Sequence, residues 1–177
     1  MLQFLRKFLA AVGLGEPVSK GDAERSILDE VRDAAPWVAN CLNISRYRAD
    51  FSLESLREID RFFDDQAPGG KAKPGGLLAQ DINIRVFALG AYIGEVLRRN
   101  AGGQWIGDDT DPQAGFNVTL KLKGGVLIWP VQRAFKRLHN EGGHGVWAED
   151  SIYHYGLMTL GKLATASDGG KDAMRPP

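Results

Sequence analysis

The chain has 177 residues with 22 basic and 22 acidic side chains, so its formal net charge at pH 7 is zero, which does not favour nucleic acid as the partner. Hydrophobic residues make up 44% of the chain, as is ordinary for one globular domain that buries its core without covalent staples. The one cysteine, Cys41, excludes a disulfide framework and a cysteine-rich zinc site within the chain, and it favours a reducing, cytoplasmic location.

The first stretch, Met1–Leu14, has the pattern of an amphipathic helix. We expect residues 1–15 to dock on the protein itself or on a second copy of the chain, as in a homodimer. A signal peptide and a helix lying on a membrane surface are alternatives that we do not favour, because the charges follow the helical phase and no clear cleavage site follows. The apolar stripe consists of Leu2, Leu5, Leu9 and Val12, widened by Phe4 and Phe8.

Two helices are predicted in the next part of the chain. The first covers Asp22–Ala34 and ends before Pro36, because proline removes a helical hydrogen bond. A separate short turn of helix is then expected around Trp37. The second helix covers Leu53–Asp65 with Ser52 as its N-cap, and its charged side is typical of a solvated face.

The stretch Ile82–Arg99 predicts a helix buried at the centre of the domain, with Gly102-Gly103 ending it. Its apolar residues form two neighbouring rows, and a helix that is apolar on more than one side is usually buried. Gly90 and Gly94 each weaken a helix by roughly 1 kcal/mol relative to alanine, so we expect close approach of another backbone there. The rows are Ile82, Val86, Leu89, Ile93 and Val96, and Ile84, Ala88 and Ala91.

Glu95 continues the second apolar row, so its carboxylate points inward and needs a partner or a proton. The favoured interpretation is a salt bridge to Arg98 or Arg99 near the helix end. The next is a hydrogen bond to backbone amides or to the indole of Trp105. The third is a catalytic acid or base.

After the central helix the sequence has the period of β-strands. Gln104–Ile106 predicts a short strand, and Phe116–Lys123 alternates between an apolar and a polar face, as an antiparallel strand with one wet face does. The fold class is therefore α+β, with a central buried helix and further helices packed against a small antiparallel sheet of three or more strands.

Gly124-Gly125 predicts a two-residue hairpin turn after the alternating strand. Such a turn pairs Leu122 with Leu127, and it places both Leu127 and Trp129 on the core side of the sheet.

Pro130 is suited to begin the next helix. Its basic residues are expected to face outward, close to the lysines of the hairpin, and to form the most basic surface of the chain. A solvated helix face is the favoured interpretation, and an anion-binding or acidic-partner site is the alternative. The residues concerned are Lys121, Lys123, Arg133, Lys136 and Arg137.

The last predicted helix, Ile152–Leu163, is capped by Asp150 or Ser151. Gly156 in this helix suggests close contact with the glycines of the central helix. A single domain is therefore expected over residues 20–163, and residues 164–177 are expected to be a disordered tail.

The sequence lacks the familiar catalytic motifs, so we predict no metal and no cofactor. No G-x-S-x-G elbow is present, and His139 and His144 do not have the H-E-x-x-H spacing. A hydrolase-like pair of Glu95 and Asp150 is conceivable only if the last helix abuts the central one.

Three segments, LGAYIGEVLRRNAGGQW, IWPVQRAFKRLHNE and EDSIYHY, occur in an order that resembles a widespread group of small bacterial domains of unknown function, over Phe51–Leu160. The resemblance implies no agreed chemistry, although some small bacterial proteins of this build serve as immunity or accessory proteins. It rests on Gly94, Glu95, Gly103, Trp105, Pro130, Glu149, Asp150 and Ser151.

The favoured function is a non-catalytic module that binds another protein, of the kind that immunity proteins exemplify. A hydrolase-like enzyme using Glu95 and Asp150, and an anion-binding module using the basic surface, are the alternatives. The candidate binding residues are Glu95, Arg98, Trp105, Lys121, Trp129, Arg133, Lys136, Arg137 and Ser151.

Overall fold

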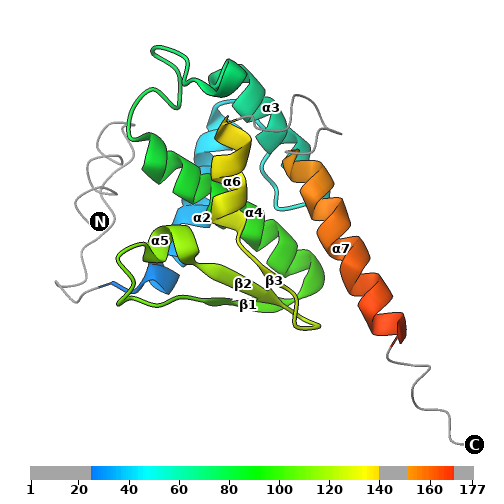
Figure 1. Ribbon diagram of the computed structural model, residues 1–177. Coiled ribbons are helices and arrows are strands. Elements are labelled where there is room, and N and C mark those ends of the chain that lie inside the picture. The colour runs from blue at the N-terminus through cyan, green and yellow to red at the C-terminus, as the bar shows by residue number, and fades with distance from the viewer. Residues whose placement is uncertain (1–24, 140–150, 170–177) are drawn as a thin grey trace, which may run out of the picture.

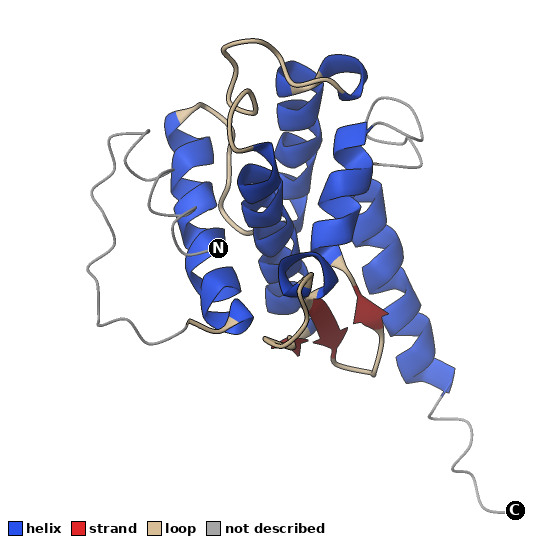
Figure 2. Cartoon of the chain, turned by 60° about the vertical axis from the view of Figure 1, so that its left-hand side comes forward, coloured by secondary structure: helices blue, strands red, loops and turns tan. Residues whose placement is uncertain are grey.

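The computed structural model describes residues 25–139 and 151–169 of the chain (Figure 1). The predicted helix Met1–Leu14, the candidate residue Asp150 and residues 170–177 lie outside the described residues. The fold is α+β as predicted, with helices packed against a three-stranded antiparallel sheet. Figure 2 shows this small sheet at one end of the helices. The helices are α2 (Ile27–Ile44), η1 (Leu53–Ser55), α3 (Leu56–Gln66), η2 (Pro68–Gly70), α4 (Ile82–Ala101), α5 (Ala114–Asn117), α6 (Pro130–His139) and α7 (Ile152–Gly169).

Helix α4 is the buried centre of the fold, as its two apolar rows predict. Its residues from Val86 to Gly94 are all buried, and the helix lies between α2 and α6 in both ribbon views (Figures 1 and 2). The predicted stop is also present, because Gly102 caps the helix with a φ of 70°, which a residue with a side chain rarely adopts.

The glycines of α4 lie where neighbouring segments approach the helix most closely. A Cβ atom on Gly90 would lie 2.5 Å from the Cα of Val131 in α6. A Cβ atom on Gly94 would lie 2.1 Å from the ring of Trp105. The predicted approach of another backbone is confirmed at Gly90, whereas at Gly94 a side-chain ring lies against the helix instead. Helix α7 is not the partner of either glycine, since Gly156 faces Leu56.

Helix α2 runs without interruption through Pro36, so the prediction of two separate pieces is wrong. An interior proline costs a helix ~3 kcal/mol or more. Burying Val31, Val38 and Leu42 against the rest of the core contributes about 1.5–3 kcal/mol each, which outweighs that cost.

The predicted cap at Ser52 is present, because its hydroxyl accepts a hydrogen bond from the backbone N–H of Ser55 at 3.2 Å. It caps the short helix η1, however, and α3 itself begins three residues later than predicted, at Leu56. Helix α7 packs along α3 (Figure 1) and continues to Gly169, beyond its predicted end at Leu163. The first part of the tail expected to be disordered is therefore helical, which agrees with the strong helix propensity of Ala164 and Ala166.

The sheet has the order β1-β2-β3, with β1 at Gly103–Ile106, β2 at Thr119–Leu122 and β3 at Leu127–Ile128. Strand β2 is shorter than predicted, because the chain before it forms α5. Phe116, expected on the core side of a strand, lies in α5 instead and is exposed.

The hairpin register differs by one residue from the predicted one. Leu120 pairs with Ile128 and Lys121 with Leu127, since the turn takes up Lys123 as well as the two glycines. A shift of one residue moves every side chain of a strand to the other face. Ile128 is therefore buried, and the prediction that Leu127 and Trp129 belong to the core is wrong.

Candidate functional site

Glu95 is bound by side chains from its own helix and from β1. Its carboxylate accepts hydrogen bonds from Arg98 Nε at 2.7 Å and from the indole Nε1 of Trp105 at 2.9 Å. Arg99 Nε forms a longer ion pair with the same carboxylate, at 3.6 Å from Glu95 Oε2. The two favoured interpretations of Glu95 thus hold together, because Gly94 lets the Trp105 ring lie close against α4.

The charge of Glu95 is stabilised although the side chain is only 13% exposed. Burial alone raises the pKa of this carboxyl group, but the hydrogen bonds from Arg98 and Trp105 and the charges of Arg98 and Arg99 outweigh it. The pKa of Glu95 is therefore below its usual value. The hydrogen bond from Trp105 to this carboxylate links β1 to α4, so Glu95 has a structural role between the two elements.

A second acidic residue, Asp60 of α3, is buried at the start of α7 and was not predicted as a site residue. It is 1% exposed and accepts hydrogen bonds from Arg137 Nε at 3.0 Å and from the Ser151 hydroxyl at 2.9 Å. The backbone N–H groups of Ile152 and Tyr153 donate to the same carboxylate at 2.8 and 3.0 Å. Asp60 thus caps α7 from a neighbouring helix.

Two candidate binding residues, Arg137 and Ser151, belong to this buried cluster. Arg137 is 3% exposed and also donates to Asp64 at 2.6 Å, so its predicted outward position is wrong. The sequence contained a signal for the cluster, because Asp60 follows Leu56 by four residues and so continues the apolar side of α3. The same argument singled out Glu95 on the central helix.

The predicted basic surface does not form as a group. Lys121, Lys123 and Lys136 are exposed. Arg133 donates to the Ser151 carbonyl at 3.2 Å and lies over the ring of Tyr155. Of the five predicted basic residues, the three exposed ones are therefore Lys121 and Lys123 in the hairpin and Lys136 in α6.

The outer face of the sheet, which points away from α4, carries exposed apolar side chains. Ile106, Leu127 and Trp129 are 46%, 46% and 42% exposed. Single exposed apolar residues are normal on a protein surface, whereas several on one sheet face are characteristic of an interaction site. We call this face the sheet surface, and its residues are Gln104, Ile106, Thr119, Lys121, Leu127 and Trp129.

The sheet surface is organised in two rows that cross the strands. In one row Lys121 lies between Gln104 and Leu127. In the second row, Thr119 of β2 pairs with Ile106 of β1. If the register between β2 and β3 is continued by one residue, Trp129 lies on the opposite side of Thr119 from Ile106.

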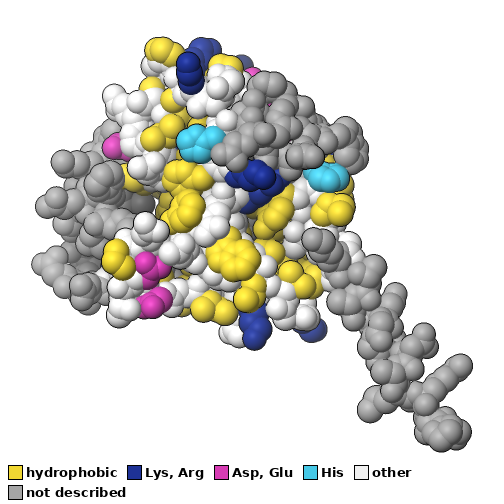
Figure 3. Space-filling view, viewed as in Figure 1, with side chains coloured by type: hydrophobic (Ala, Val, Ile, Leu, Met, Phe, Trp, Pro, Cys, Tyr) yellow, Lys and Arg dark blue, Asp and Glu magenta, His cyan; other side chains and the backbone are white. Residues whose placement is uncertain are grey.

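Another exposed aromatic side chain lies close to α6. Phe116 of α5 is 43% exposed and packs edge-on against Phe135 of α6, with ring centroids 5.6 Å apart. In Figure 3, hydrophobic side chains gather over α6 and the hairpin, with charged side chains between and around them.

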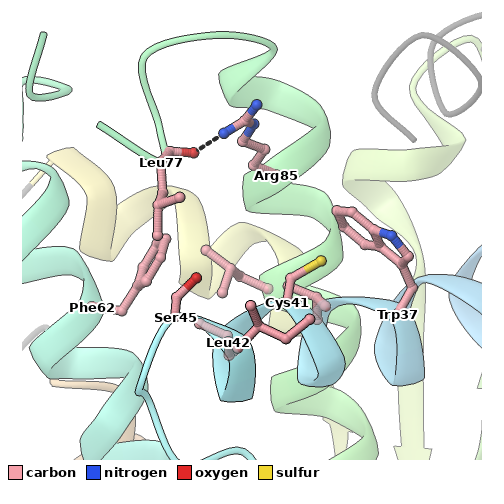
Figure 4. A pocket seen from close by; sticks show the side chains of 10 residues that line it. Trp37, Cys41, Leu42, Ser45, Phe62, Leu77 and Arg85 are labelled. Carbon is pink, nitrogen blue, oxygen red and sulfur yellow. Dashed lines mark hydrogen bonds between the residues drawn. The ribbon is translucent and has the colours of Figure 1, made fainter. Parts of the chain in front are cut away.

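A separate apolar pocket of about 130 Å³ lies between α2, α3 and α4 (Figure 4). The Cys41 sulfur points into it from α2, and Arg85 of α4 donates to the Leu77 carbonyl at its edge. Burial raises the pKa of the Cys41 thiol, and nearby Arg85 offsets part of that effect. The other lining residues are Trp37, Val38, Leu42, Ile44, Ser45, Phe62 and Leu89.

Metal-ligand clusters and membrane spans are both absent from the described residues, 25–139 and 151–169. Within these ranges no three or more His, Cys, Asp or Glu side chains are grouped as metal ligands. No helix in the same part of the chain has the length and apolar character needed to cross a membrane.

Comparison with known proteins gives no relative for this chain: no family model, no curated protein and no solved structure matches it. The resemblance to small bacterial domains therefore stays a prediction, carried by the sequence segments alone.

Proposed function

We propose that this chain is a non-catalytic module that binds another protein through the sheet surface. The observation that supports the proposal is the outward position of Ile106, Leu127 and Trp129 on one face of the sheet. Covering such side chains removes apolar area from water at about 25 cal/mol per Å². Tryptophan is also the residue type that most often dominates the binding energy of an interface.

The charges of the sheet surface favour a partner that differs from the chain itself. Lys121 lies in the middle of one row, and Lys123 follows it at the exposed end of the hairpin. If two copies met through this face about a two-fold axis, the lysines of both would be brought together, which is unfavourable. The partner we propose presents an apolar patch with acidic side chains beside it; a toxin that the chain neutralises is one protein of this kind.

The enzyme alternative has less support. Glu95 is bound by Arg98, Arg99 and Trp105, and it does not line the apolar pocket. Its lowered pKa also makes it a weak general base. Asp150, the other residue of the suggested pair, lies outside the described residues.

Replacing Trp129 with glutamate tests the proposal, because the side chain is exposed and the change should not disturb the core. The partner is first captured from the source organism with the full-length chain, identified by mass spectrometry and purified. Trp129→Glu should then weaken its binding by about 30-fold or more in a calorimetric titration, since an interface hot spot contributes about 2 kcal/mol or more. Met158→Glu is the matched control, because Met158 is 51% exposed on α7, away from the sheet surface.

A second variant tests the charge of the partner. Lys121→Glu should weaken binding at low salt more than at high salt, since the attraction between exposed charges is screened by ions. If Trp129→Glu and Met158→Glu bind the purified partner equally, the sheet surface is not the interface. If the wild-type chain forms concentration-dependent dimers that Trp129→Glu abolishes, a second copy is the occupant and the proposed partner is wrong.

A further inference from the structure

The apolar pocket between α2, α3 and α4 has the size of one side chain. A cavity of about 150 Å³ accommodates a benzene ring. The pocket, at about 130 Å³, can therefore take one phenylalanine ring or one leucine side chain. Its walls are mainly apolar, and beside it the side chain of Ile44, at the end of α2, is 68% exposed.

The chain itself contains a segment with matching side chains. Met1–Leu14 carries an apolar stripe that includes Leu5, Phe8 and Leu9, with Arg6, Lys7 and Ala10 on the opposite side. A stripe of this kind needs an apolar surface to cover it.

The segment is attached where it can reach the pocket. It precedes α2, the helix that supplies Trp37, Cys41 and Ile44 to the pocket. Cys41 lies roughly 20 Å along the axis from the start of α2, at about 1.5 Å per residue. The connecting residues, Gly15–Ser26, span up to about 40 Å when extended, so the segment can turn back along α2.

We propose that Met1–Leu14 docks against α2 and inserts an apolar side chain of its stripe, Leu or Phe, into the pocket beside Cys41. This contact goes beyond the proposed function, since the pocket shares no residue with the sheet surface. It makes the pocket a receptor for the chain's own N-terminal segment, and anything that competes for the pocket releases that segment.

Cys41 makes the proposal directly testable, because it is the only cysteine in the chain and lines the pocket. Single cysteines are introduced into the full-length chain on the stripe, as Leu2→Cys, Leu5→Cys, Phe8→Cys and Leu9→Cys. A short bis-maleimide then links them to Cys41 if the segment is docked, and tryptic peptides identify the link by mass spectrometry. Lys7→Cys and Ala10→Cys on the opposite side of the stripe are the matched controls.

We expect an intramolecular link from at least one stripe position and little from either control. Links of equal yield at stripe and control positions would show an undocked segment and overturn the proposal, as would the absence of any link. Links that join two chains would assign the pocket to a second copy's segment, which also overturns it.

A second measurement needs no crosslink. In the double variant Leu5→Asp/Phe8→Asp, Cys41 should be alkylated at least about tenfold faster than in the wild-type chain, which corresponds to ~1.4 kcal/mol of docking free energy. Arg6→Asp/Ala10→Asp should leave the rate close to that of the wild type. Equal rates for both double variants would contradict the proposal. If Cys41 reacts equally fast in the wild-type chain and in Leu5→Asp/Phe8→Asp, and only the wild-type chain is recovered on added phospholipid vesicles, the stripe covers a membrane surface and the proposal is overturned.

Discussion

Glu95 shows what an acidic side chain does in an apolar row of a buried helix. It is held by Arg98 and by the Trp105 indole, so a single carboxylate joins α4 to β1. The inward position of this residue could be predicted from helical spacing alone. Its partners could be named only as alternatives, because Arg98, Arg99 and Trp105 all lie within reach in the sequence and the spacing does not decide between them.

The pH dependence of stability should reveal the Glu95 contact. A carboxyl group whose pKa is lower in the folded than in the unfolded chain stabilises the fold above the unfolded value and loses this effect as the pH falls through the folded value. Glu95→Gln should lower the free energy of unfolding at pH 7 by ~1–3 kcal/mol. The difference between variant and wild type should shrink below about pH 4.5, the ordinary pKa of this group. Urea denaturation at several pH values measures it, and a difference that is constant from pH 7 to pH 3 would contradict the assignment.

Replacing Asp60 should lower the free energy of unfolding more than replacing Arg137. Without Arg137, the Asp60 carboxylate keeps the Ser151 hydroxyl and the N–H groups of Ile152 and Tyr153. Without Asp60, the buried guanidinium keeps Asp64, but the N–H groups of Ile152 and Tyr153 at the start of α7 lose their acceptor, and the Ser151 hydroxyl caps only His154. Asp60→Leu should therefore cost about 3–5 kcal/mol, as breaking a buried ion pair does, and Arg137→Leu should cost less. Chemical denaturation gives both values, and the reverse order would show that the cap contributes little.

At the scale of the element, the glycines of α4 are the features that the sequence predicts best. Their cost in helix stability is compensated by close packing, and the structure supplies it through α6 and Trp105. The sequence could not name those partners, because Gly156 of α7 offered an equally small residue at helical spacing.

Gly90→Ala should destabilise the protein although alanine favours helices. The new Cβ would lie 2.5 Å from Val131 Cα, so α6 would have to move, and overpacking of this kind costs about 1–3 kcal/mol. Gly161→Ala in α7 is the matched control, because no neighbouring segment of the described chain comes within 4 Å of its Cβ position. That control should gain up to about 1 kcal/mol from helix propensity alone. Thermal unfolding compares the two, and stabilisation by both variants would mean that α6 yields without cost.

The hairpin shows the limit of sequence patterns for this chain. Gly124-Gly125 is compatible with a two-residue turn and with the longer turn that the structure has, and the two differ by one residue in register. Leu127 and Trp129 are apolar in either case, so hydrophobicity alone assigns them to the core. Their exposure, on which the proposed function depends, follows only from the turn that the chain adopts.

For the whole molecule, the buried ion pair is also a junction. Asp60 contributes from α3, Arg137 from α6, and Ser151 from the start of α7, so helices distant in sequence meet at one carboxylate. Neither the composition nor the net charge of zero indicates such a junction, because the junction depends on which charged side chains the fold buries. The α+β class could be predicted since it follows from local periodicity, whereas this long-range contact could not.

The junction has a consequence for how the chain can vary. Arg137, near the end of α6, and Ser151, just before α7, both donate to the carboxylate of Asp60. This shared partner holds the end of α6 close to the start of α7. Doubling the number of residues between two fixed anchors costs only about 0.6 kcal/mol in closure entropy. We therefore expect the chain to accept residues inserted between His139 and Ser151, a new binding loop among them, at little cost in stability as long as Asp60 holds both anchors.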